Sequence, residues 1–292
     1  MAKVDSKTRG TVVVTGASTG IGRACALRLD RLGFLVFAGV RRDADGKALK
    51  KASKSGLTPL LIDVTEKASI TAAASAVDNA VGEEGLAGLV NNAGIAVPGP
   101  LEFLPLDDLR SQMEVNVIGQ VAVTQSFLPL LRKGQGRIVN IGSIGGRMAT
   151  PFLGAYAASK FAMEALTDSL RMELKPWGIS VSIIEPGSID TRMWEKGQDA
   201  ADVLLEKLPP EGHKFYDPAV NAMRKAAEKT AREAIPPSAV AKAVVHALTS
   251  DKPKTRYVVG TDARIQAVVA RLVPDRMRDW LVAREMGLTQ GP

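Results

Sequence analysis

Short apolar runs alternate along most of the chain with longer stretches whose apolar residues recur at helical spacing. The runs are rich in β-branched residues, which is typical of strands buried on both faces of a parallel sheet. Seven strands are predicted, at Thr11–Thr15, Leu35–Val40, Leu57–Val64, Gly88–Gly94, Arg137–Ser143, Ile179–Glu185 and Arg256–Gly260.

Helices are predicted between these strands. Gly20–Leu32 has helical spacing until Gly33 stops the pattern, and Asp107–Leu131 and Ala155–Lys175 are two longer helices. Strands that alternate with helices of this length predict an α/β fold, a doubly wound, seven-stranded parallel sheet with helices on both faces. Ligands of such sheets bind beyond the carboxyl ends of the strands. Candidate residues stand at those ends: Gly16, Asn91, Ser143 and Pro186.

The chain shows no internal repeat and no break in composition, so residues 1–292 are expected to form a single domain. The stretch 188–237 holds seven prolines and glycines and is expected to be an irregular loop over the edge of the sheet. Residues 261–292 would form a C-terminal extension beyond the last strand.

Composition excludes several classes of protein. With 46% hydrophobic and 24% charged residues, the chain resembles ordinary globular proteins rather than disordered or fibrous ones. The single cysteine, Cys25, excludes an intrachain disulfide and a cysteine-based zinc cluster, and His213 and His246 leave little for a histidine site. We therefore predict no metal.

The net charge of +7 is unevenly distributed. Residues 220–292 hold 13 basic and 7 acidic residues, a local +6, whereas the first 219 hold 25 and 24. We therefore describe the extension 261–292 as basic. Such a segment raises nucleic-acid or membrane binding as a second class of function. Pro274 interrupts any single amphipathic helix there, so a solvated face or a subunit contact is preferred. Nucleic acid is not predicted as a partner, and contact with an acidic membrane surface stays a minor alternative.

No targeting segment is visible. Met1–Gly10 is polar, no apolar h-region follows it, and no apolar run approaches the roughly 20 residues that span a bilayer. A cytoplasmic location is expected, which agrees with the single thiol.

A glycine-rich segment, Thr15–Gly22, joins the first strand to the first helix. Its spacing, G-x-x-x-G-x-G, suits either a loop that brings backbone N–H groups to a pyrophosphate or a plain tight turn. The same residues match G-x-S-x-G, the nucleophile elbow of serine hydrolases, with Ser18 as nucleophile. A position after the first strand is a poor centre for a hydrolase sheet, so this alternative is the weaker one.

A second set of residues lies in the middle of the chain. Tyr156 and Lys160 are four residues apart on a predicted helix and share a face. A lysine ammonium near a tyrosine favours the phenolate and would lower the tyrosine pKa from its reference of about 10. Such a tyrosine exchanges a proton with an alcohol or a carbonyl, and Ser143 would hydrogen-bond the same oxygen.

In this order and spacing, the motifs resemble those of the short-chain dehydrogenase/reductase family, whose fold is a compact Rossmann form. The resemblance spans about Thr11 to Arg192. Its motifs are the T-G-x-x-x-G-I-G loop, the turn Asn91-Asn92-Ala93-Gly94, Asn116, Ser143, Tyr156-x-x-x-Lys160 and Pro186-Gly187.

The resemblance implies a role for each matching residue. Tyr156 would be the general acid in carbonyl reduction and the base in alcohol oxidation, and Lys160 would hold the nicotinamide ribose. Ser143 would orient the carbonyl oxygen, and Asn116 would position a water in the proton relay. The implied cofactor contacts are Gly16, Ser18, Gly20, Ile21, Gly22, Arg41, Asp63, Val64, Asn92, Ala93, Gly94, Tyr156, Lys160, Pro186, Gly187, Ile189 and Thr191.

Cofactor choice depends on the end of the second strand. An acidic residue there binds the ribose hydroxyls of NAD, whereas an arginine accommodates the 2′-phosphate of NADP. This chain has Val40 at the acid position and Arg41 after it, which favours NADP(H). NAD(H) remains the alternative, because Asp43 or Asp45 would also reach a ribose and Thr19 stands where many NADP-dependent relatives carry a basic residue.

A finer resemblance points to the branch of retinol, hydroxysteroid and 3-hydroxybutyrate dehydrogenases, on the segments Gly33–Gly39 and Lys175–Gly178, the latter leading to Ile184–Gly187. It implies reversible oxidation of a lipophilic secondary alcohol to a ketone, with 188–237 as the substrate loop and Met193 and Trp194 as a lid or a plain anchor. The family also implies a homodimer or homotetramer. A cofactor-binding protein without activity remains the other alternative.

Overall fold

The structure, a computed structural model, describes residues 9–206 and 208–285. In this part of the chain, seven parallel strands form one sheet in the order β3-β2-β1-β4-β5-β6-β7, which confirms the predicted doubly wound sheet. The strands are β1 (Thr11–Val14), β2 (Leu35–Val40), β3 (Thr58–Leu61), β4 (Gly88–Asn91), β5 (Arg137–Ile141), β6 (Ser180–Pro186) and β7 (Arg256–Val259). The strand order reverses between β1 and β4, so the carboxyl ends of these two strands flank the crevice where such folds bind ligands.

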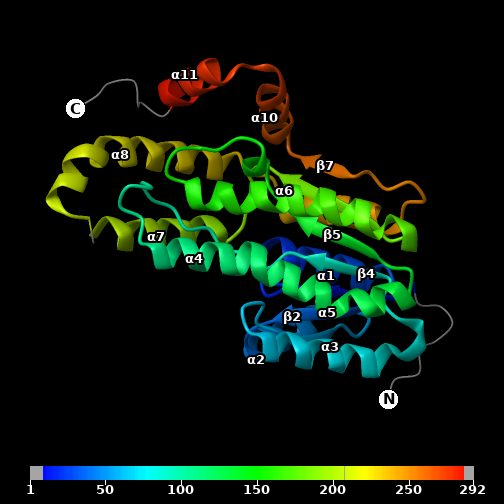
Figure 1. Cartoon of the computed structure of the whole chain (residues 1–292). Coiled ribbons are helices and arrows are strands. Elements are labelled where there is room, and N and C mark those ends of the chain that lie inside the picture. Colours follow the sequence, from blue (N-terminus) through cyan, green and yellow to red (C-terminus); the bar gives the residue numbers. More distant parts are fainter. Residues whose placement is uncertain (1–8, 207, 286–292) are drawn as a thin grey trace.

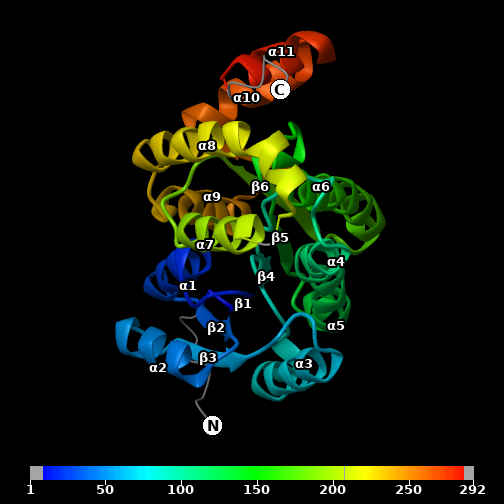
Figure 2. The same cartoon turned by 90° about the vertical axis from the view of Figure 1, so that its left-hand side faces the viewer.

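Helices cover both faces of the sheet (Figures 1 and 2). One face carries α1 (Gly20–Arg31), α2 (Asp43–Ala52) and α9 (Pro237–Thr249). The other carries α3 (Lys67–Val81), α5 (Gly119–Lys133) and α6 (Gly154–Leu174). Each face has its own apolar core: Leu29 and Val244 pack in the first, and Val77 and Phe127 in the second. This burial fixes the strand ends and thereby the loops that follow them.

The predicted helix 107–131 is helical throughout but not uniform. It consists of α4 (Leu106–Met113), a π-helical segment (Glu114–Ile118) and α5. Single π-turns inside α-helices occur frequently at functional sites, because the extra residue changes where the following side chains point. Asn116 stands in this segment.

The prediction of an irregular loop at 188–237 is wrong, because most of it is helical. It contains α7 (Met193–Glu206) and α8 (Pro210–Arg232). Four of its five prolines lie at helix starts, Pro209 and Pro210 before and in α8 and Pro236 and Pro237 before and in α9, where a fixed φ and a missing N–H cost nothing. The side chain of Trp194 lies outside the described residues.

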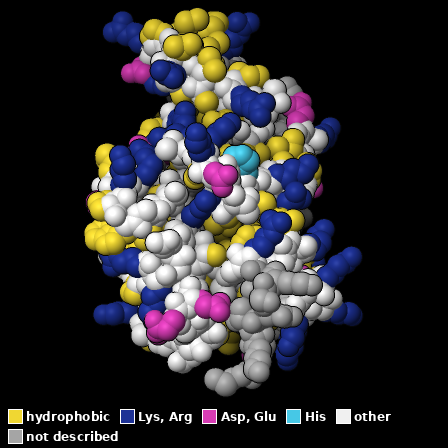
Figure 3. All heavy atoms as spheres, turned by 90° about the vertical axis from the view of Figure 1, so that its right-hand side faces the viewer, with side chains coloured by type: hydrophobic (Ala, Val, Ile, Leu, Met, Phe, Trp, Pro, Cys, Tyr) yellow, Lys and Arg dark blue, Asp and Glu magenta, His cyan; other side chains and the backbone are white. Residues whose placement is uncertain are grey.

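The C-terminal extension forms α10 (Thr261–Leu272) and α11 (Asp275–Glu285), separated at Pro274 as predicted. Both helices stand away from the body (Figures 1 and 2). The extension is less basic than predicted, because it holds five arginines and four carboxylates. Most of the excess of basic residues lies in 220–260. Apolar side chains gather among the basic ones on this protruding part (Figure 3). The exposed ones include Ile265, Val268, Leu272, Met277 and Trp280.

Short 3₁₀ turns complete the described part: Gly82–Glu84, Ile144–Gly146 (η3) and Lys175–Trp177. Residues 1–8 and 286–292, which include parts of the predicted N-terminal segment and extension, lie outside the described residues. Among the helices of the described part, none has the length and apolar character needed to cross a membrane.

Candidate active site

Thr15 joins the glycine loop to the turn after β4 through a network of hydrogen bonds. Its hydroxyl accepts hydrogen bonds from the N–H groups of Asn92 (2.9 Å) and Ala93 (3.0 Å). Asn92 in turn donates through Nδ2 to the carbonyls of Thr15 (2.9 Å) and Gly16 (3.1 Å). Two motifs about 75 residues apart therefore form one rigid unit. Thr15 was not among the predicted contacts, although its hydroxyl beside Gly16 was visible in the sequence.

The N-terminus of α1 is open. Thr19 makes no side-chain cap, and the first turn carries no acidic residue. Gly20 has a φ of +54°, and a Cβ on it would lie 3.0 Å from Cγ2 of Thr191, so only glycine brings these two segments so close. Uncapped N–H groups at a helix start suit a phosphate. The loop, with Ser18 and Ile21 half-buried and Gly22 buried, fits the pyrophosphate of a dinucleotide.

The end of β2 is basic and exposed. Arg42 is bound to Asp45, with Nε 2.9 Å from Oδ2, whereas the described residues offer no hydrogen-bond partner to the exposed Arg41. Asp63 lies near Arg41. Burial opposes ionisation of Asp63, but two hydrogen bonds from Thr65 and the charge of Arg41 outweigh it and lower its pKa. This corner therefore presents one available guanidinium beside a carboxylate.

Ser143 and Tyr156 come together from η3 and α6. Ser143 Oγ accepts from the N–H of Gly145 (3.0 Å) and also hydrogen-bonds Tyr156. Lys160 lies one turn further along α6. Its Nζ donates to the carbonyl of Ile141 (2.8 Å) and lies 5.7 Å from the centroid of the Tyr156 ring. A hydroxyl, a phenol and an ammonium thus meet at the carboxyl end of β5.

The expectation that Lys160 lowers the pKa of Tyr156 is wrong for this structure. Burial raises the pKa of Tyr156 above its usual value, and the hydrogen bond from Ser143 only partly offsets this. Burial also lowers the pKa of Lys160 to about 8, against the charge of Glu164. The physical reason is desolvation, which disfavours both the phenolate and the ammonium.

The Asn116 side chain is bound by protein groups. Its Oδ1 accepts from the N–H of Ile95 (2.8 Å), and its Nδ2 donates to the carbonyl of Ile95 (2.9 Å) and to Ser159 Oγ (3.1 Å). Gly94 lies against the same carboxamide. Asn116 therefore fixes the loop after β4 to α6, and its role toward a water stays a prediction.

The loop after β6 is held by a residue that the sequence reasoning missed. Asp262, in the first turn of α10, accepts through Oδ2 from the N–H of Ser188 (2.7 Å). Ile189 is buried and forms an isolated parallel bridge with Ile235, and Thr191 follows at the glycine loop. No spacing signal pointed to Asp262, since it is 74 residues from Ser188. Val64, also a predicted contact, is buried just beyond β3.

Strand ends at the switch point of a parallel sheet, an open helix start, and the half-buried Ser143 and Tyr156 beside the buried Lys160 define the class of nicotinamide-dependent oxidoreductases. A family model described as short chain dehydrogenase matches residues 10–202. The chain therefore belongs to the short-chain dehydrogenase family and is an NAD(P)-dependent oxidoreductase.

Three relatives are similar over nearly their whole length. The chain is 38% identical to 17-beta-hydroxysteroid dehydrogenase type 6 of Bos taurus, over 94% of this chain and 87% of the relative. It is 36% identical to retinol dehydrogenase 5 of Mus musculus (94% and 89%) and to the NADPH-dependent 3-dehydrocapnine reductase of Ornithobacterium rhinotracheale (94% and 96%). The predicted retinol and hydroxysteroid branch is confirmed.

Solved structures agree on the fold. A short-chain dehydrogenase from Streptomyces avermitilis has a TM-score of 0.77 at 29% identity, covering 98% of this chain and 100% of that one. One from Burkholderia cenocepacia in complex with NADP has a TM-score of 0.70 at 27% identity (95% and 98%), and one from Burkholderia phymatum in complex with NAD 0.76 at 25% (94% and 95%). The family thus includes both cofactor choices.

Family membership removes the serine-hydrolase alternative. The two histidines that it needed have other partners: His213 contacts Asp217 on α8 (3.0 Å), and His246 contacts the Tyr257 hydroxyl (2.8 Å). Ser18 therefore belongs to the glycine loop rather than to a triad.

Proposed function

We propose that this protein interconverts a lipophilic secondary alcohol and its ketone with NADP(H). The observation that carries the proposal is the meeting of Ser143, Tyr156 and Lys160 at the end of β5. The bound cofactor would supply the hydride. Tyr156 would donate a proton to the carbonyl oxygen in reduction and accept one in oxidation, while Ser143 orients that oxygen.

Lys160 would hold the nicotinamide ribose. An ammonium has three donors, and one of them is used by the carbonyl of Ile141. The raised pKa of Tyr156 keeps its proton on at neutral pH, so its acid role in reduction needs no activation. Oxidation needs the phenolate and would therefore accelerate toward alkaline pH. Asn116 would serve through the loop it anchors.

The choice of NADP(H) is supported by Arg41 at the end of β2. Among the described residues its guanidinium has no hydrogen-bond partner, whereas the neighbouring Arg42 forms an ion pair with Asp45. Val40 supplies no carboxylate for a ribose. A relative is NADPH-dependent by name. NAD(H) is the competing cofactor.

A lipophilic substrate is supported by the apolar surroundings of the α6 start. Phe103 and Phe152 each meet the Tyr216 ring edge-on, with centroids 5.9 and 6.0 Å apart. Leu104, Ala155 and Leu204 form a small apolar cluster beside them, which joins α7 to the start of α6. Relatives named for retinol and hydroxysteroids act on large apolar alcohols. We further propose a single-domain, cytoplasmic protein that forms a homodimer or homotetramer through the helix 107–131 (α4 to α5) and α6. On α6, Phe161 and Met172 are exposed.

Tyr156→Phe tests the catalytic assignment. We expect turnover of steroid ketones with NADPH to fall by about 10²- to 10⁴-fold, since the proton donor is removed. Calorimetry should show nearly unchanged binding of NADPH. Tyr257→Phe is the matched control, because its hydroxyl contacts His246 rather than the site. Equal rates in wild type and Tyr156→Phe would refute the assignment.

Arg41→Ser tests the cofactor. Calorimetric titration of the wild type should give tighter binding of NADPH than of NADH. Arg41→Ser should weaken NADPH about 10-fold or more and leave NADH unchanged, since a charge-assisted contact to the 2′-phosphate contributes roughly 1.5–3 kcal/mol. Arg42→Ser, whose guanidinium is bound to Asp45, should leave the ratio in place. Tighter binding of NADH by the wild type would overturn the choice of NADP(H).

A further inference from the structure

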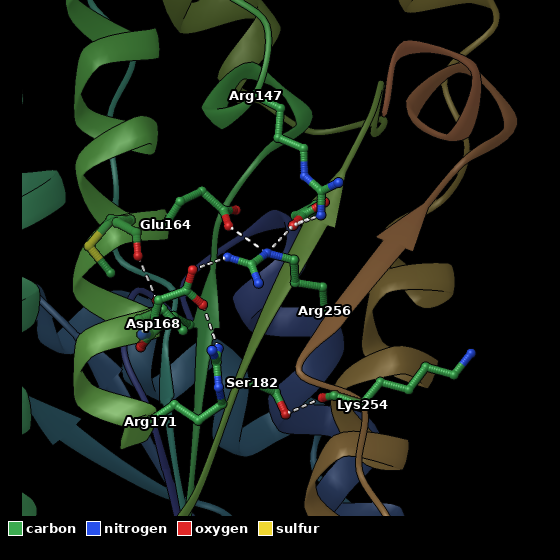
Figure 4. Close-up of polar contacts among 11 residues, drawn as sticks. Arg147, Glu164, Asp168, Arg171, Ser182, Lys254 and Arg256 are labelled. Atoms are coloured by element: carbon green, nitrogen blue, oxygen red, sulfur yellow. Dashed lines mark hydrogen bonds and ion pairs between the residues drawn. The ribbon is translucent and has the colours of Figure 1, made fainter. Parts of the chain in front are cut away.

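A cluster of buried and half-buried charges joins four segments of the chain (Figure 4). Arg256 on β7 contacts Glu164 Oε2 (Nε, 3.0 Å), Asp168 Oδ2 (Nη2, 2.6 Å) and Glu185 Oε1 (Nε, 3.4 Å). Arg147, directly after η3, contacts Glu185 Oε1 through Nη2 (2.6 Å). We call these five residues the charge cluster.

Burying the carboxylates of the charge cluster carries a desolvation cost that opposes stability. The Glu185 side chain is fully buried, and that of Glu164 is 12% exposed. Within the described residues, Glu164 Oε1 and Glu185 Oε2 are buried without a hydrogen-bond partner. Replacing such ion pairs with apolar side chains is often neutral or stabilising, because desolvation of the ions can exceed their attraction. The charge cluster is therefore a candidate for a role besides stability.

Glu164 lies on the same helix as Tyr156 and Lys160. It lies four residues after Lys160 on α6, so the two side chains share a face. η3 packs at the same place: a Cβ on Gly146 would lie 2.8 Å from the carbonyl oxygen of Lys160 and 3.2 Å from Cγ of Glu164. Ser143 caps the start of η3, and Arg147 follows its end. The cluster thus touches the segments that carry Ser143 and Lys160.

We propose that Glu164, held by Arg256, is a positioning residue that keeps the Lys160 side chain in its ammonium form. The proposal rests on the role proposed above for Lys160. In this arrangement Arg256 brings β7 into contact with the catalytic helix, and the Arg147–Glu185 pair fixes η3 against β6. A carboxylate of this chain would thereby compensate for the desolvation of Lys160.

The charges that face Glu164 agree with this role. They are Lys160 and Asp168 on α6, Glu185 on β6, Arg256 on β7 and Arg147 after η3. Burial, together with Glu185, raises the pKa of Glu164 to about 7, against the two arginines. Above pH 7 Glu164 is therefore mostly ionised, in the range where Lys160, with a pKa of about 8, needs a negative neighbour. Below pH 7 Lys160 keeps its proton without support.

Glu164→Gln tests the proposal, with Asp168→Asn as the matched control. Asp168 also binds Arg256, but it lies two turns beyond Lys160, is 36% exposed and is held by Arg171 as well. Protein labelled with ¹³C at lysine Cε would be titrated by NMR, and Lys160→Met would identify the Lys160 signal. We expect Glu164→Gln to lower the titration midpoint of Lys160 by about 0.5–1 pH unit and Asp168→Asn to leave it unchanged.

The alkaline limb of the kcat/KM profile for ketone reduction should move in the same direction in Glu164→Gln and return toward the wild type in Glu164→Asp. An unchanged Lys160 midpoint in Glu164→Gln, or an equal shift in Asp168→Asn, would overturn the proposal. If Glu164→Gln does not fold, Glu164→Asp serves in its place with a smaller expected shift. The NMR titration needs no turnover. Failure of the proposed function would appear as wild-type protein without activity on any ketone and is therefore distinguishable from failure of the role proposed for Glu164.

Discussion

Two polar networks hold α6, and they differ in charge. On the β4 side, Asn91 Nδ2 donates to Thr124 Oγ1 (2.8 Å) and Asn140 Oδ1 (2.9 Å), and Asn140 Nδ2 donates to Thr167 Oγ1 (2.9 Å) on α6. We call these four residues the amide network. On the β7 side, the charge cluster holds the same helix through Glu164 and Asp168. One network is neutral and the other is ionised.

The difference separates two ways of placing a catalytic helix. Hydrogen bonds between amides and hydroxyls do not titrate, so the amide network fixes geometry alike at every pH in the working range. Paired carboxylates and guanidiniums respond to pH and act on neighbouring charges. Both networks therefore hold α6 in position, whereas the charge cluster sets the electrostatic environment of Lys160.

The largest expected effect comes from Arg256→Met. This change leaves Glu164 and Glu185 buried without their shared partner, and breaking a buried pair in this way costs about 3–5 kcal/mol. Urea unfolding at pH 8 measures the loss. Adding Glu164→Gln to Arg256→Met should recover part of the stability, because it removes the carboxylate that has lost its arginine, whereas Glu185 keeps its contact with Arg147. A loss below about 1 kcal/mol at pH 8 would contradict the picture of an ionised cluster.

The same loss should depend on pH. The folded-state pKa of Glu164, about 7, lies above its ordinary value of 4.5, so the folded protein binds more protons than the unfolded one between these values. Stability from this group is therefore present below about pH 4.5 and is lost as pH rises to about 7. Arg256→Met raises the pKa of Glu164 further. Its destabilisation should thus be smaller at pH 5.5 than at pH 8.

A smaller effect is expected from Thr167→Val in the amide network. The substitution keeps the shape of the side chain and removes the acceptor for Asn140 Nδ2, at a cost of roughly 1–3 kcal/mol for the unpaired buried donor. Since no member of this network titrates, the loss should be the same at pH 5.5 and pH 8 in urea unfolding. A clear pH dependence in Thr167→Val would erase the distinction between the two networks.

Much of the site was predictable from local patterns. The glycine loop, the Asn92 turn and the Tyr156–Lys160 spacing are short motifs whose neighbours in sequence are also neighbours in space. The helices of 188–237 were not predicted, because the prolines and glycines of this stretch were read as loop signals. Several of these prolines in fact begin helices. The direction of the Tyr156 pKa was also wrong, since the sequence shows a nearby lysine but not the depth of burial.

The sequence by itself determined the alternation of strands and helices, the motifs at the strand ends and the family to which they point, since each depends on residues within one element or one turn. Only the tertiary structure decided that Asp262 holds Ser188, and that Arg256 reaches Glu164 across 92 positions. The physical reason is that the pairing of β6 with β7 sets these contacts, and pairing depends on the packing of the whole sheet rather than on spacing along the chain.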